Sequence, residues 1–149
     1  MAGISDIPGV NILEPNIKNR LCIVSFYVTN LHHNLIVRLL DNKFGIQARG
    51  GCSCAGTYGH ILLNVDKQQS QQIVNEVNNG NLSRKPGWVR ISLHPTNTDA
   101  EAHFVVNSLK SIVENANEWQ SEYKFDERLG DYLPIDDSEG GSTLFSQAS

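Results

Sequence analysis

The chain has 149 residues, of which 40% are hydrophobic and 19% charged, with a formal net charge of −4 at pH 7. This length suits one domain with its own core, and the composition excludes a disordered or fibrous chain. The acidic balance argues against nucleic-acid binding through bulk positive charge. No run approaches the roughly 18 apolar residues of a membrane span, and no signal-peptide pattern is present. Three cysteines are too few for a disulfide scaffold, so we expect a cytoplasmic protein.

The first part of the chain predicts turns followed by a strand. Residues 1–18 contain Pro8-Gly9 and Pro15-Asn16, which are typical of a lead-in segment with turns rather than a domain. The stretch from Leu21 to Val28 is rich in β-branched and aromatic residues, which favour a strand. Both of its faces are largely apolar, so we expect both to be covered.

A helix is predicted over about residues 32–44. Gly45 follows at the position where glycine often ends a helix. The apolar residues of this helix repeat at helical spacing: Leu35, Ile36, Leu39, Leu40 and Phe44. Residues 46–49 are then a candidate for a short strand, and they lead into a loop at 50–56 that has no periodicity.

The second half of the chain predicts two more helices and one more strand. A polar helix fits residues 67–78, and residues 88–93 alternate as a half-buried strand does. Thr98 and Glu101 form the capping-box pattern that begins a helix. Its apolar stripe consists of Val105, Leu109, Ile112, Val113 and Ala116. Residues 123–149 are acidic and rich in Gly and Ser, so they predict a loose tail.

This order of elements predicts an α/β fold, a small two-layer α/β sandwich with its helices on one face of the sheet. We place this domain at residues 19–122. Because the strand at 21–28 is apolar on both sides, the second face of the sheet is expected to lie against a surface that this chain does not supply.

The loop at 50–56 is the first candidate for chemistry. Its glycines allow a close approach of the backbone to a ligand. A thiol such as Cys54, in the same loop region as the cation of Arg49, could act as a nucleophile. The alternative is that the cysteines are small buried hydrophobic residues. A zinc site is less favoured, because the C-x-C spacing lacks a second ligand pair; it would use Cys52, Cys54, His60 and His94.

The second candidate is Arg90, which by alternation points away from the apolar face of the strand at 88–93. Its guanidinium could hold a carboxylate with two parallel hydrogen bonds. The alternative is a solvated arginine on a strand. The third candidate, His32-His33, is more typical of a helix cap or a surface than of catalysis.

Three segments resemble motifs of class-V aminotransferase-fold enzymes, in the branch that includes cysteine desulfurases and selenocysteine lyases. The first is the strand at 19–28 followed by His32-His33. The second lies at 44–56, where R-x-G-x-x-C-A is matched by Arg49, Gly51, Cys54 and Ala55. The third resembles R-x-S-L-x-x-x-N-T-x-x-E and is formed by Arg90, Ser92, Leu93, Asn97, Thr98 and Glu101. The resemblance covers about residues 12–119.

The resemblance implies the C-terminal small domain of a pyridoxal 5'-phosphate enzyme of fold type I, acting on a small amino acid. Cys54 stands at the position of the desulfurase nucleophile, which takes sulfur from the substrate cysteine as a persulfide. Arg90 stands at the position of the arginine that binds the substrate α-carboxylate, and Arg49 begins the mobile loop of the substrate site. Cys52-Ser53 stands where desulfurases often have His-His, so another class-V reaction is the alternative chemistry.

The resemblance also implies a cofactor lysine in a large N-terminal domain, and no lysine of this chain stands in the matching context. The lysines are Lys18, Lys43, Lys67, Lys85, Lys110 and Lys124. We therefore expect a fragment, a split-gene product or a relic that is inactive alone and needs a large cofactor-binding domain. The whole enzyme would be a homodimer. The alternative is a non-catalytic α/β interaction domain derived from the same family.

Overall fold

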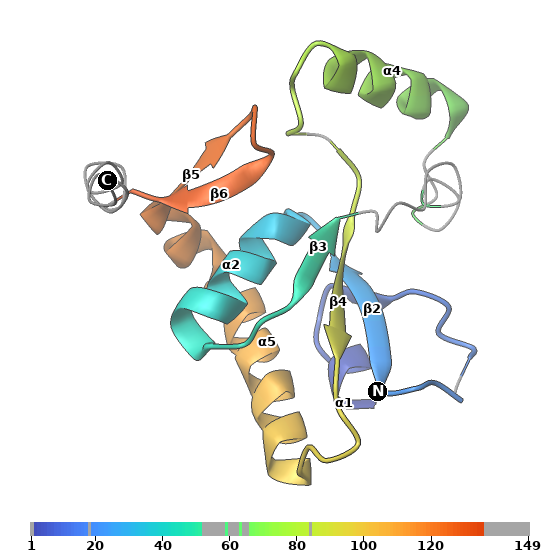
Figure 1. Cartoon of the computed structure of the whole chain (residues 1–149), viewed down its shortest axis with the longest axis vertical. Helices are drawn as coiled ribbons and strands as arrows, with labels where there is room; N and C mark the ends of the chain where they lie inside the picture. Colours follow the sequence, from blue (N-terminus) through green and yellow to red (C-terminus); the bar gives the residue numbers. More distant parts are fainter. Residues whose placement is uncertain are drawn as a thin grey trace, which may run out of the picture.

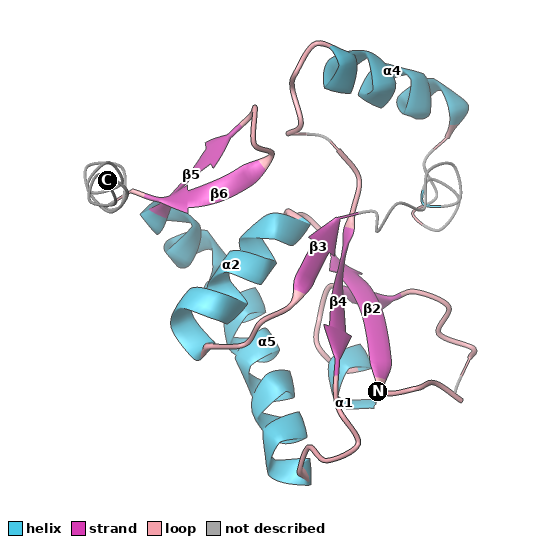
Figure 2. Cartoon of the chain, in the orientation of Figure 1, coloured by secondary structure: helices cyan, strands magenta, loops and turns pink. Residues whose placement is uncertain are grey.

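A computed structural model describes residues 2–17, 19–51, 59, 63, 66–83 and 85–135 of the chain. The elements in chain order (Figures 1 and 2) are α1 (Ala2–Ser5), β1 (Val10–Ile12), β2 (Ile23–Val28), α2 (His33–Phe44), β3 (Arg49–Gly51), α4 (Lys67–Asn78), β4 (Trp88–Ser92), α5 (Asp99–Trp119), η1 (Gln120–Glu122), β5 (Tyr123–Asp126) and β6 (Asp131–Pro134). Within these residues, no helix has the length and apolar character needed to cross a membrane.

The main sheet has four strands in the order β1-β2-β4-β3, and each pair of neighbours is antiparallel. Its register places Val24 opposite Ile91 and Phe26 opposite Val89. Helices α2 and α5 cover one face of this sheet, and α4 stands apart at one end of the molecule (Figure 1). The predicted α/β class and its two-layer arrangement with helices on one face are confirmed.

The core lies between that face and the two long helices. From the sheet, Phe26, Val89 and Ile91 are buried in it. The helices supply the rest of the largest buried side chains: Leu35, Ile36, Leu39, Leu40, Leu109 and Ile112. Full burial of such a side chain contributes about 1.5–3 kcal/mol, so this layer holds the strands in place.

Local signals fix both ends of α2 and the start of α5. The ring nitrogen Nδ1 of His32 accepts a hydrogen bond from the backbone N–H of Asn34 and caps the start of α2. At its other end, Gly45 adopts a left-handed conformation with φ 66°, which glycine tolerates without a Cβ clash. Thr98 and Glu101 form the predicted capping box at the start of α5. The expected helices over 32–44 and from Thr98 are thus confirmed.

The N-terminal residues are more integrated than the predicted lead-in segment. Strand β1 pairs with β2, with Val10 opposite Val28, and becomes an edge of the sheet. The apolar side chains of Ile4 and Ile7 are buried in the core. A strand of only three residues carries no periodic pattern, which is why turn signals dominate this part of the sequence.

The strand predicted from Leu21 begins later than expected. Cys22 has a left-handed φ of 47° and is exposed, so the interpretation of this cysteine as a strand residue is wrong. Leu21 is 90% exposed. The short strand predicted at 46–49 is likewise displaced to Arg49–Gly51, where Gly50 and Gly51 pair with Val89 and Trp88.

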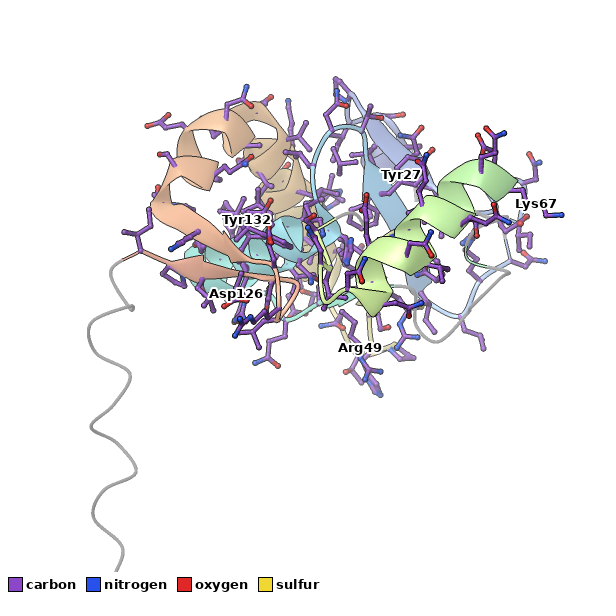
Figure 3. All side chains as sticks on the ribbon, turned by 90° about the horizontal axis from the view of Figure 1, so that it is seen from above. Tyr27, Arg49, Lys67, Asp126 and Tyr132 are labelled. Atoms are coloured by element: carbon purple, nitrogen blue, oxygen red, sulfur yellow. The ribbon has the colours of Figure 1, made fainter. Side chains whose placement is uncertain are left out.

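The predicted loose tail needs correction over residues 123–135. Strands β5 and β6 form an antiparallel hairpin against α2, with Tyr132 lying over that helix in Figure 3. Arg38 donates to Asp131 at 2.5 Å, and Asn34 donates to the carbonyl of Gly130 at 2.5 Å. These contacts, together with the buried ring of Tyr123, hold the hairpin on the domain. Residues 136–149 lie outside the described part of the chain.

Candidate functional site

The sheet face opposite α2 and α5 carries a polar row across three strands. Successive side chains of a strand point to opposite faces, and Phe26 and Val89 point into the core. Their neighbours Ser25 and Arg90 therefore lie on the other face, where the register sets them opposite each other. The register also sets Arg49 of β3 opposite Arg90. We call this side of the sheet the open face.

Aromatic and apolar side chains flank the polar row on the open face. On one side of the row lie Tyr27, two residues from Ser25 on β2, and Trp88, two residues from Arg90 on β4. Trp88 is buried and yet lies outside the core cluster of the helical layer. Ile23 lies on the other side of the row, opposite Ser92, and is 42% exposed. The open face thus offers an apolar frame around two cationic groups.

Arg90 is half-buried and has no charge partner among the described residues. Its Nε atom is buried and has no hydrogen-bond partner among the described residues. The side chains of Arg90 and Arg49 form no hydrogen bond or ion pair with another described residue. An unsatisfied buried N–H costs about 1–3 kcal/mol, more when the group is charged. A guanidinium in this position is suited to an incoming oxyanion, because it offers parallel donors in a rigid fork.

Arg49 begins β3, at the edge of the sheet, and is exposed. Figure 3 shows it at the lower margin of the view, below one end of α4. The sequence singled out Arg49 and Arg90 separately, but their pairing follows from the strand order β2-β4-β3. This long-range register cannot be read from local patterns.

His33 positions the strands that carry both arginines. A Cβ atom at Gly87 would lie 2.5 Å from the His33 ring, and one at Gly50 would lie 3.2 Å from it. The ring therefore occupies the space of two missing side chains, one just before β4 and one within β3. Burial is the largest cause that lowers the pKa of His33 to about 4. The neutral ring serves as packing between the strands.

The sequence interpretation of His32-His33 as a cap or surface pair is right for His32 and wrong for His33, which is buried. A usable signal was present, because His33 precedes Ile36 by three positions and so falls on the apolar stripe of α2. The stripe contains Ile36 and Leu40, and both are fully buried.

The loop that carries the cysteines lies largely outside the described residues. Cys54, Cys52 and His60 lie outside the described residues, so the structure does not test the nucleophile or the zinc hypothesis. His94, the other proposed ligand, is exposed and has Thr96 as its hydrogen-bond partner. Within the described part of the chain, no group of three or more His, Cys, Asp or Glu side chains could hold a metal ion.

Comparison with known proteins identifies a family. A scan against protein-family models matches the family described as Aminotransferase class-V over residues 1–105. A search of the curated proteins finds no match. The matched span contains the four-stranded sheet with Arg49 and Arg90 and ends within α5, so the β5-β6 hairpin lies beyond it.

Proposed function

Because the chain belongs to the class-V aminotransferase family, we propose that it is the carboxylate-binding part of a pyridoxal-phosphate-dependent enzyme that acts on a small amino acid. One observation carries the proposal: the half-buried Arg90 lies on the open face, and its guanidinium has no partner among the described residues. Two parallel hydrogen bonds from Arg90 would hold the α-carboxylate and orient the substrate. In this proposal the domain is the C-terminal small domain of the whole enzyme.

The described residues do not by themselves fit a complete cofactor site. No strand of the main sheet carries a lysine. Lys43 is held by the carboxylate of Glu122 at 2.8 Å and lies over the ring of Trp119. The remaining described lysines are exposed: Lys67, Lys85, Lys110 and Lys124. We assign the cofactor lysine and the phosphate site to a large domain that packs on the open face. The homodimer would form in the whole enzyme that contains both domains.

The finer proposal is cysteine desulfurase-like chemistry. It is supported by the motif at 49–55, in which Cys54 would accept the sulfur of the substrate. Arg49, next to this loop, would contact the substrate from β3. The cofactor would supply the electron sink for this chemistry. The alternative is another class-V reaction that needs no thiol, which the replacement at Cys52-Ser53 favours.

The assignment of the cofactor lysine to another domain predicts how the chain reacts with pyridoxal phosphate. After borohydride reduction and peptide mapping, we expect the label to be spread over exposed lysines, with no single lysine labelled stoichiometrically. Pyridoxal, which lacks the phosphate, is the matched control and should give the same pattern. One lysine labelled stoichiometrically by the phosphate form alone would contradict this assignment.

A second candidate function is supported by apolar side chains in and just before β2. Ile17, Leu21 and Ile23 are all exposed. Such side chains favour a non-catalytic interaction domain that binds a partner protein. The two functions differ at Arg90, because an interaction domain has no reason to bind a free amino acid there.

A further inference from the structure

We propose that Arg49 and Arg90 form one site for two negative charges, so that the substrate is an amino acid with a second acidic group on its side chain. This inference rests on the part of the proposed function in which Arg90 binds the α-carboxylate, and it favours the alternative class-V reaction that needs no thiol over desulfurase chemistry, because cysteine has no second carboxylate-like group. It assigns the second acidic group to Arg49.

The first argument is the placement of the two arginines. They are direct cross-strand partners on antiparallel strands. Side chains in this relation share a face, and their Cβ atoms lie about 4.5–5.5 Å apart. Both guanidinium groups can therefore reach a single small molecule on the open face.

The second argument is the uncompensated charge of the pair. Like charges directly opposite each other destabilise a sheet. None of the four strands of this sheet carries an Asp or Glu. This lack of acidic partners contrasts with the rest of the chain, which has a net charge of −4 and in which Arg38 is paired with Asp131. The repulsion between Arg49 and Arg90 is thus not relieved by an acidic residue of this sheet.

The third argument compares the pair with possible ligands. One carboxylate has two oxygen atoms and is satisfied by the fork of one guanidinium. A substrate with only an α-carboxylate would occupy Arg90 and leave Arg49 unmatched. A second acidic group, one or two carbons away, would neutralise Arg49 as well and remove the repulsion. The geometry therefore favours an aspartate-like substrate over an alanine-like one.

The test is a titration of the full chain, with arginine side chains labelled with ¹⁵N and their Nε–H signals recorded by NMR at constant ionic strength. We expect L-alanine to move the Arg90 signal alone. L-aspartate should move the signals of both Arg90 and Arg49 and bind about tenfold more tightly, as one added charge-assisted contact would give. Arg49→Gln should reduce the affinity for L-aspartate to that for L-alanine. Arg128→Gln, at an exposed position in the β5-β6 turn, is the control and should change neither.

The outcomes separate this inference from the proposed function. If L-alanine and L-aspartate bind equally through Arg90, and Arg49→Gln has no effect, the two-charge site is wrong while the carboxylate site stands. If inorganic phosphate moves both signals at lower concentration than L-aspartate, the pair is a phosphate site and the assigned substrate class is wrong. If neither amino acid moves the Arg90 signal, both proposals fail.

Discussion

Ile91→Ala should destabilise the chain by about 2–5 kcal/mol, whereas Ile23→Ala should cost less than about 1 kcal/mol. The two isoleucines lie on neighbouring strands but on opposite faces of the sheet. Ile91 is buried in the core, so its truncation leaves a cavity among packed side chains. Ile23 lies on the open face, where its side chain is already partly hydrated. Urea unfolding of the two variants measures the difference.

The comparison is matched, because the same atoms are removed at both positions. It tests whether only one face of the sheet carries the core of this chain. Equal losses of stability at Ile23 and Ile91 would mean that the chain itself covers both faces. The open face would then not be available for a substrate or for a second domain.

Acid should destabilise the fold through the buried His33 and its neighbour His32. The pKa of His33 is lowered to about 4, chiefly by burial, while His32 and Lys85 act in the same direction and Asp131 opposes them. Burial also lowers the pKa of His32. Between pH 6.5 and 4 the unfolded chain binds a proton that the folded His33 does not. Stability is therefore complete above pH 6.5 and is lost as the pH falls toward 4.

For His33 alone, the loss is about 2 kcal/mol by pH 5 and about 3 kcal/mol in total. Urea unfolding at pH 7, 6 and 5 measures it. His33→Gln removes the titrating ring and should flatten this dependence, even if it lowers stability at pH 7. His103→Gln, at an exposed position on α5, should keep it. An unchanged slope in His33→Gln would show that the ring is not held neutral between the strands.

Much of the fold could be predicted from local patterns. The helical stripe and its glycine end defined α2, and the capping box defined the start of α5. Alternation around Arg90 placed its side chain on the correct face. These features depend on near neighbours in the sequence, and therefore a local pattern contains them.

Other features depend on partners that are distant in the sequence. The hairpin at 123–134 is held by Asn34 and Arg38, about 90 positions earlier in the chain. Its tight turn did leave a local signal, since Asp126 accepts hydrogen bonds from the next residues and Gly130 has a φ of 65°. The pairing of Arg49 with Arg90 left no such local signal in the sequence. It depends on the order of strands in the sheet, which local periodicity does not determine.

The most direct test of the carboxylate site is the Arg90 Nε–H signal of the ¹⁵N-labelled chain during addition of L-alanine or of L-alaninamide. The two ligands differ only in the carboxylate, the group that we assign to Arg90. We predict that L-alanine moves this signal, that L-alaninamide does not, and that Arg90→Lys weakens L-alanine binding about tenfold, because an ammonium cannot form the planar fork. An Arg90 signal that responds equally to both ligands, or to neither, would contradict the account.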